Sequence, residues 1–390
     1  MNIIPAIQDI HPRMPDSVAV TTVIRARTCP RRPVLEYSLR GYLLPIQHPH
    51  AILGNIAHAF FEAVTLSNPP LHEDDLDRYW TAAVDQMQRR AADDPDARGW
   101  IPFAESIHGL ERARLRAIRQ ALTLPPRSSA VASTLKGSNE CRLGAEVKVV
   151  VDAPPTKLRG SIDLVYESDG KLHLVDWKTG SILEEQTGEV NPEYRDQLDL
   201  YAGMYGETFG RFPDQLTLRP LAGREVSWES SPERSDSLLK VAKQRAAELH
   251  FGRQSITADH SGLEAIEAVP DRNGNCMECR ARPHCLAYLV DVLDAQAPAV
   301  HLGDSTWASV DLQGVAGAPV QCNGVTTVPL TSNGKTVYLR FLSSEELNSS
   351  IAAGTLVTAF GTKRSSWTSD DVAQDPAEFL LPPTGRIAIR

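Results

Sequence analysis

The sequence predicts an α/β domain with a helical insertion, followed by a small β domain. Three observations carry this prediction. Residues 51–66 repeat apolar side chains at helical spacing, residues 144–178 fall into short runs rich in Val, Ile and Leu, and charge thins after about residue 297. We therefore expect one domain over 1–295, with the insertion at about 68–140, and a second over 297–390.

The first part of the chain is expected to be helical. Apolar residues of 51–66 recur every three or four positions, as in an amphipathic helix. Helices are also expected at 73–92 and 104–123, and the Pro-, Ser- and Gly-rich residues 125–139 indicate a loop.

Strands are expected next, because β-branched residues concentrate in short runs. The expected strands are 144–151, 158–167, 171–178, 214–221 and 223–229. A helix at 192–208 separates the third run from the fourth, and a last helix is expected to follow Ser231-Pro232, which is a helix start signal.

The C-terminal part is expected to be a β domain. Its expected strands are 306–315, 324–330, 335–342, 354–361 and 384–389. A helix is expected at 343–352, between the third strand and the fourth. Five strands with a helix at this point is an OB-like order, and an unrelated small barrel or sandwich is the alternative.

Composition excludes several classes of protein. The chain has 42% hydrophobic and 23% charged residues, which is ordinary for a globular protein. A net charge of −9 excludes a globally basic nucleic-acid-binding protein, but not a local basic groove. No apolar run approaches the ~20 residues that span a bilayer, and the N-terminal segment lacks the apolar core of a signal peptide. We expect a cytoplasmic protein with no membrane contact, whose six cysteines are thiols or metal ligands.

The hairpin predicted at Asp169-Gly170 places two carboxylates side by side. Asp-Gly between alternating apolar runs is a strong signal for a two-residue turn. This turn sets Asp163 opposite Asp176, with Cβ atoms ~5 Å apart. Facing carboxylates repel each other, and Lys178 on the same face compensates only in part. Oxygen ligands around such a gap suit Mg²⁺ or Mn²⁺, whereas a solvated salt bridge is the simpler interpretation.

Four further residues are candidates for the same site. His58 lies on the 51–66 helix and, as a neutral imidazole, is a candidate metal ligand. Gln197 and Tyr201 are four residues apart and so share one face of the 192–208 helix. Glu146, on the strand before the hairpin, is a candidate for holding water at the metal. Each of the four also has a simpler interpretation as a packed or solvated side chain.

Taken in order, these residues resemble the PD-(D/E)XK nuclease superfamily, in its RecB-like branch. The resemblance covers about 30–290 and implies a restriction-endonuclease-like mixed sheet flanked by helices. The implied metal ligands are His58, Asp163, Asp176 and the Trp177 carbonyl. The implied catalytic residues are Asp163, Asp176, Lys178 and Glu146, with Lys178 orienting or activating the attacking water. Gln197 and Tyr201 would contact DNA near the cut.

The cysteine spacing predicts a second metal site. Cys276, Cys279 and Cys285 form a dense group, and a closed site needs a fourth thiolate. The remaining cysteines are Cys29, Cys141 and Cys322. Zinc and an iron–sulfur cluster both accept four thiolates, so spacing leaves the choice open.

The position of Cys29, before the nuclease motifs, is similar to that in iron–sulfur members of the superfamily. These are the AddB-type nuclease domains and the CRISPR-associated RecB-like exonucleases. The resemblance implies a 4Fe–4S cluster, with zinc as the less favoured alternative, and the cluster would be a structural staple. Its implied ligands are Cys29, Cys276, Cys279 and Cys285.

These features lead to the hypothesis of a Mg²⁺- or Mn²⁺-dependent DNA exonuclease. It would hydrolyse phosphodiester bonds at DNA ends or in single-stranded DNA, in repair, CRISPR adaptation or phage defence, with a helicase, an integrase or another complex as partner. Arginine-rich residues 25–40 and 112–119 are candidates for phosphate contacts. The first alternative is a non-cleaving, DNA-end-binding structural subunit of a helicase or integrase complex, and the second is a zinc-stapled interaction protein.

Overall fold

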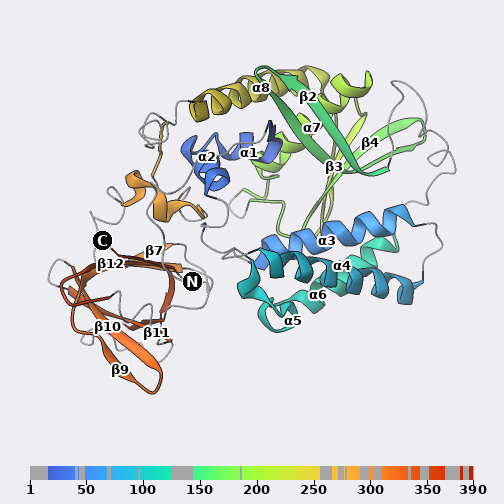
Figure 1. Ribbon diagram of the computed structural model, residues 1–390. Coiled ribbons are helices and arrows are strands. Elements are labelled where there is room, and N and C mark those ends of the chain that lie inside the picture. Colours follow the sequence, from blue (N-terminus) through green and yellow to red (C-terminus); the bar gives the residue numbers. More distant parts are fainter. Residues whose placement is uncertain are drawn as a thin grey trace.

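In the computed structural model, a mixed sheet and two groups of helices precede a C-terminal sheet (Figure 1). The structure describes residues 16–39, 43, 49–67, 72–94, 97–124, 144–184, 187–254, 266–270, 276, 279–289, 299–302, 309–332, 335–342, 351–364, 378–380 and 386–389. Within these ranges, no helix combines the length and apolar character that crossing a bilayer requires.

The first sheet has six strands and confirms the expected mixed architecture. Its strands are β1 (Ser17–Ala19), β2 (Gly144–Ala153), β3 (Thr156–Ser168), β4 (Lys171–Lys178), β5 (Gln215–Pro220) and β6 (Val226–Glu229). The order is β1-β3-β4-β5-β6, with β2 paired to β3. The β1–β3 and β4–β5 pairs are parallel and the others antiparallel. Strand β1 was not anticipated, because three residues carry no readable alternation.

Helices cover both sides of this sheet (Figure 1). On one side lie α1 (Val20–Arg25), α2 (Arg31–Ser38), α7 (Pro192–Phe209) and α8 (Pro232–Gln254). On the other lie α3 (Pro49–Leu66), α4 (Glu73–Asp93), the 3-10 turn Arg98–Trp100, α5 (Phe103–Ser106) and α6 (Leu110–Ala121). The helix expected over 104–123 is divided into α5 and α6, because Gly109 adopts a left-handed φ of 83° just before α6.

Two apolar clusters hold the layers together. One joins β2, β3 and β5 to α1, α7 and α8, and the other joins α3, α4 and α6 to the end of β4. In the second cluster Trp177 of β4 stacks on Phe61 of α3, with ring centroids 4.5 Å apart. Helix α3, which carries His58, is thereby fixed against the strand that carries Asp176 and Lys178.

The β3–β4 hairpin has the predicted turn and register. Asp169 and Gly170 adopt φ values of 53° and 74°, as a two-residue turn of this type requires. The ladder runs from Ser168–Lys171 to Leu164–Val175, where it ends. Beyond this point β1 pairs with the first part of β3, at residues 157–159. Residues 160–163 of β3 therefore lie between the part paired with β1 and the part paired with β4.

The C-terminal sheet has eight strands. They are β7 (Ala299–Leu302), β8 (Ser309–Ala316), β9 (Val320–Cys322), β10 (Val325–Ser332), β11 (Lys335–Leu342), β12 (Leu356–Arg364), β13 (Glu378–Leu380) and β14 (Arg386–Ile389). Five of them pair in a ring, from β8 to β10, β11, β13, β12 and back to β8. The helix expected at 343–352 falls almost wholly outside the described residues, and the OB-like fold and the domain boundaries stay predictions.

Candidate active site

The two hairpin carboxylates lie where β3 and β4 separate. Asp163 and Asp176 stand one position beyond the last ladder pair, and both side chains are buried. Asp163 Oδ2 accepts a 2.7 Å hydrogen bond from the backbone N–H of Trp177. This carboxylate therefore satisfies a backbone donor that the separating strands would otherwise leave unpaired.

Helix α3 and strand β2 each bring one side chain to Asp163. His58 Nδ1 lies 3.1 Å from Asp163 Oδ1. Glu146 lies between Ala145 and Val147, which pair with the residues on either side of Asp163. Ligand atoms of His58, Glu146 and Asp163 lie within 4.8 Å of one another. In the described part of the chain, no other three His, Cys, Asp or Glu side chains come this close together. One imidazole and two carboxylates are a suitable donor set for Mg²⁺ or Mn²⁺.

Glu146 is held in this position by its backbone and by two donors. Its φ of 50° is left-handed, a conformation that costs a residue with a Cβ about 1–2 kcal/mol. Its Oε2 accepts hydrogen bonds from Lys148 Nζ at 2.7 Å and from Ser161 Oγ at 2.5 Å. Strained backbone of this kind is typical of functional sites, where the surrounding structure holds it.

Lys178 connects the carboxylates to α7. Its Nζ lies 2.6 Å from Asp176 Oδ2 and donates to Gln197 Oε1 at 3.0 Å. Gln197 Nε2 in turn donates to Tyr201 Oη at 3.3 Å, and the Lys178 ammonium also lies 4.8 Å from the centroid of the Tyr194 ring. The structure thus brings Gln197 and Tyr201 to the same site as Lys178.

Burial and charge shift the pKa values of these groups. Burial raises the pKa of Asp176 despite the nearby ammonium of Lys178. Burial disfavours the charged form of Lys178, but the carboxylates of Asp176 and Asp163 outweigh it and raise the pKa of the ammonium. For His58 too, burial is outweighed by Asp163, whose charge and hydrogen bond raise the pKa of the imidazole. Lys178 is therefore a firmly protonated cation.

Gly160, which has no side chain, leaves space for the ring of Tyr201. A Cβ at this position would lie 2.6 Å from Cε1 of Tyr201 and 3.3 Å from Cγ2 of Val149. The Tyr201 ring therefore packs directly against the β3 backbone, three residues before Asp163. Burial also raises the pKa of Tyr201, so its hydroxyl stays protonated.

The family model of the PD-(D/E)XK nuclease superfamily matches residues 17–286, which is more than half of the chain. The chain belongs to this superfamily. The predicted superfamily is confirmed. Its RecB-like branch with an iron–sulfur cluster stays a prediction.

Two curated relatives of this nuclease each carry the name of an ATP-dependent helicase/nuclease subunit. The Clostridioides difficile protein is 36% identical over 64 residues, or 16% of this chain and 5% of its own length. The Staphylococcus epidermidis protein is 24% identical over 156 residues, or 38% of this chain and 12% of its own length. The chain thus matches only a small part of the length of these relatives. A solved structure from Eubacterium rectale, 11% identical, covers 61% of this chain and 82% of its own, with a TM-score of 0.36.

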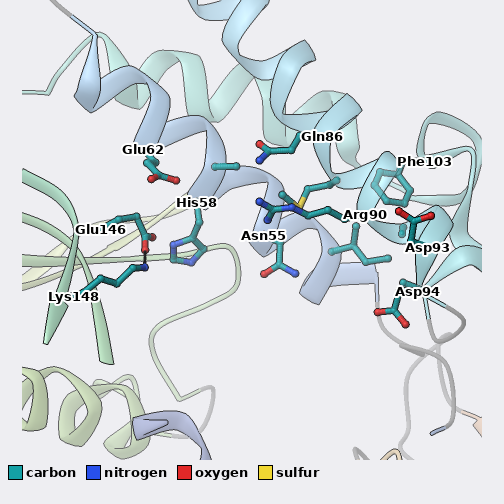
Figure 2. Close-up of a pocket in the computed structure, with 15 residues that line it drawn as sticks. Asn55, His58, Glu62, Gln86, Arg90, Asp93, Asp94, Phe103, Glu146 and Lys148 are labelled. Carbon is teal, nitrogen blue, oxygen red and sulfur yellow. Dashed lines mark hydrogen bonds and ion pairs between the residues drawn. The ribbon is translucent and has the colours of Figure 1, made fainter. Parts of the chain in front are cut away.

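The nuclease site opens into a cavity of about 870 Å³ between α3, α4 and β2. Figure 2 shows His58 and Glu146 pointing toward each other on one side of it, with Lys148 bound to Glu146. Asn55, Gln86 and Arg90 line the remainder. The metal-binding group therefore faces a space large enough for a ligand. The Trp177 carbonyl as a further ligand stays a prediction.

The four cysteines singled out in the sequence line a single small cavity. Cys29 lies just before α2, and Cys276, Cys279 and Cys285 follow α8 around the 3-10 turn Arg282–His284. Burial raises the pKa of Cys279 to about 12. Cys322 is exposed on β9, and Cys141 lies outside the described residues. Four sulfur donors in one enclosed space fit a thiolate-bound metal centre.

Arginines surround this cysteine centre. Arg31, Arg32 and Arg282 line the same cavity and are buried. Arg31 donates to the Ile266 carbonyl and Arg32 to Glu36. Arg31 and Arg32 therefore face the cysteines, in contrast to the phosphate contacts expected of residues 25–40. No sequence pattern predicted that Arg282 would pair with Asp311 of the C-terminal sheet.

Proposed function

We propose that this nuclease is a divalent-metal-dependent DNA exonuclease that acts at DNA ends or on single-stranded DNA. The observation that carries the proposal is the convergence of His58, Glu146 and Asp163 beside the Asp176–Lys178 pair, at the mouth of a large cavity. Burying two of three neighbouring carboxylates costs free energy that a bound divalent cation would offset.

Each residue has a separate role in this proposal. His58 and Asp163 would hold the ion together with the neighbouring Asp176. Glu146, which lies in one group with His58 and Asp163, would accept a hydrogen bond from water beside the ion. A bound divalent ion lowers the pKa of water and shields the phosphate charge. Lys178, which Asp176 and Gln197 keep in place, orients the attacking water and places a cation where negative charge develops. The product is a DNA end with one P–O bond hydrolysed.

Gln197 and Tyr201 are proposed to contact DNA near the cut. The Gln197 amide bridges Lys178 and the Tyr201 hydroxyl, so both side chains lie beside the catalytic lysine. The family relationship supports DNA as substrate, and the relatives' names support a helicase as partner. The non-cleaving end-binding subunit is disfavoured, because a protein that only holds DNA needs none of His58, Asp163, Asp176 and Lys178 in place.

The first experiment is cleavage of end-labelled single- and double-stranded DNA with Mn²⁺. Wild type is compared with Lys178→Ala and with Lys171→Ala, an exposed lysine at the other end of β4. We expect a product ladder from wild type and Lys171→Ala, and none from Lys178→Ala. Equal cleavage by all three proteins would contradict the assignment of Lys178 to the active site. No cleavage by wild type would favour the non-cleaving, DNA-end-binding subunit.

We further propose that the cysteine centre holds a 4Fe–4S cluster. Cys29, Cys276, Cys279 and Cys285 line one small cavity, which supports a group held by all four thiolates. Zinc, which also accepts four thiolates, is the alternative. The cluster would join Cys29 to the segment around Cys279 and so close a long stretch of chain.

Iron, zinc and sulfide analysis of the anaerobically purified protein tests this assignment. We expect a brown protein that contains iron and sulfide. Cys279→Ala should lose the iron, whereas Cys322→Ala, which removes an exposed thiol outside the cysteine cavity, should keep it. Zinc in a colourless protein would establish the zinc alternative, and a full iron complement in Cys279→Ala would refute the ligand set.

A further inference from the structure

A buried ion pair joins the cysteine centre to the C-terminal sheet. Arg282 and Asp311 have side chains that are 1% and 0% exposed. Arg282 Nε donates to Asp311 Oδ2 at 2.7 Å, and a second guanidinium nitrogen donates to Oδ1 at 3.1 Å. The Tyr288 hydroxyl donates to the same carboxylate at 2.8 Å. In Figure 1 the segment that carries Arg282, in orange, lies between α2 and the C-terminal sheet.

Arg282 also holds the backbone of two cysteines. Its remaining guanidinium nitrogen donates to the Cys279 carbonyl at 3.1 Å, and its own carbonyl accepts from the Cys285 N–H at 3.1 Å. Both Arg282 and Tyr288 line the cysteine cavity. A displacement of Arg282 would therefore move Cys279 and Cys285 together.

This arrangement requires the carboxylate on β8. A guanidinium taken fully out of water is strongly destabilising unless a well-placed anion compensates it, and a two-bond Arg–carboxylate pair does so with fixed geometry. That anion, Asp311, lies 26 residues beyond Cys285, on strand β8 of the C-terminal sheet. The cation in turn lies beside thiol groups, where it favours their ionised, metal-binding form.

We propose that Asp311 is a positioning residue of the cysteine centre, and that the centre retains its metal group only while the C-terminal sheet is docked on it. This inference rests on the metal-binding cysteine centre proposed above. It gives the C-terminal sheet a function within this chain. The sheet supplies the anion that keeps Arg282, and through it Cys279 and Cys285, in place.

The direct test is Asp311→Asn, which preserves shape and removes the charge. We expect iron, or zinc if zinc is the bound metal, to be released to a chelator at least tenfold faster than from wild type. The matched control is Gln313→Ala, two residues along β8, which loses a hydrogen bond to Thr358 inside the sheet. Release from Gln313→Ala should equal that from wild type, and equal release from Asp311→Asn would overturn the proposal.

A second variant covers the case in which Asp311→Asn does not fold. Arg282→Met combined with Asp311→Leu removes both charges together, a change that buried pairs often tolerate. We expect this double variant to fold with a melting temperature near that of wild type and still to release metal at least tenfold faster. A stable double variant with wild-type release would show that the pair only stabilises the fold, and would overturn the positioning role.

The reaction of thiols with iodoacetamide, measured by mass spectrometry in metal-free protein, separates this inference from the cluster assignment. We expect Cys279 to be alkylated at least tenfold faster in Asp311→Asn than in wild type, whereas exposed Cys322 reacts equally in both. Absence of metal from wild type would contradict the cysteine metal centre. Equal alkylation of Cys279 in the two proteins would contradict the positioning by Asp311.

Discussion

The nuclease site and the cysteine centre each contain a buried ion pair, but the two pairs differ in what surrounds them. Arg282 and Asp311 are fully buried, and they also bond to the Cys279 carbonyl and the Tyr288 hydroxyl, respectively. The Lys178 side chain remains 16% exposed, and Asp176 next to it has a raised pKa because burial is not fully compensated. The first pair is balanced in charge, whereas the second lies beside a further buried carboxylate, that of Asp163, which Lys178 compensates only in part.

This difference indicates two kinds of role. A complete buried pair fixes the geometry of the chain, and removing one partner leaves a charge without compensation. An incomplete group of carboxylates stores repulsion that a divalent ion would relieve, so the site sacrifices stability for function. Substitutions in the first region should therefore act mainly on stability, and substitutions in the second mainly on catalysis.

The largest expected effect is loss of activity in Asp163→Ala. We expect Mn²⁺-dependent hydrolysis to fall by at least ~10⁴-fold, which corresponds to more than ~5 kcal/mol of transition-state stabilisation. The free energy of unfolding should change by at most about 2 kcal/mol, because losing the acceptor for the Trp177 N–H is offset by relief of carboxylate repulsion. Nuclease assays and urea unfolding measure the two quantities.

Asp163→Asn is the matched control for this substitution. It keeps an acceptor for the Trp177 N–H and removes the charge, so its unfolding free energy should equal or exceed that of wild type while its activity stays low. Cleavage at the wild-type rate by either variant would contradict the role of Asp163.

The second largest effect is expected at the buried Arg282–Asp311 pair. Arg282→Met leaves Asp311 buried without its cation, and we expect the free energy of unfolding to fall by about 3–5 kcal/mol. Lys178→Met, the corresponding change at the active site, should lower the free energy of unfolding by less, because Asp176, whose pKa burial already raises, can be neutralised by a proton. Urea unfolding of both variants, measured side by side, tests the comparison. A larger stability loss in Lys178→Met would reverse it.

A smaller effect is expected at Gly160, where the active site depends on close packing. A Cβ in Gly160→Ala would clash with the Tyr201 ring, which costs about 1–3 kcal/mol of stability. Displacing Tyr201 should also break its hydrogen bond with Gln197 and lower activity. The control is Gly54→Ala on α3, where the added Cβ would lie at an ordinary 3.6 Å from its nearest atom. This variant should gain up to about 1 kcal/mol in free energy of unfolding, because alanine favours the helix more than glycine does. Equal stabilities of the two alanine variants would exclude the clash.

Local sequence patterns predicted most strands of the first sheet and the residues that meet at the candidate active site. The Asp169-Gly170 turn fixed the β3–β4 register, and helical spacing placed Gln197 and Tyr201 on one face, because both patterns depend only on neighbouring residues. The left-handed backbone of Glu146 and the pairing of Arg282 with Asp311 could not be predicted in this way. Both depend on contacts between segments distant in the sequence, which no periodicity records.

The smallest expected effect is the pH dependence of the stability that the His58–Asp163 pair contributes. This dependence reports how strongly the Asp163 charge acts on the His58 imidazole. Burial alone would lower the pKa of His58, but the Asp163 charge and hydrogen bond raise it above its ordinary value. An unfolded histidine titrates near ~6.5. In metal-free protein the pair therefore contributes stability that is fully present below about pH 6.5. That contribution is lost as the pH rises through the raised value.

NMR titration of the His58 imidazole, with unfolding measured across the same pH range, tests this expectation. Asp163→Asn should lower the pKa of His58 and flatten the loss of stability above about pH 6.5. Saturating Mg²⁺ should move the wild-type titration to lower pH, because the ion competes with the proton for the imidazole. A His58 titration unaffected by both Asp163→Asn and Mg²⁺ would show that the imidazole lies outside the metal-binding group. His58 would then belong with the fixed, structural polar groups of the chain, as Arg282 does.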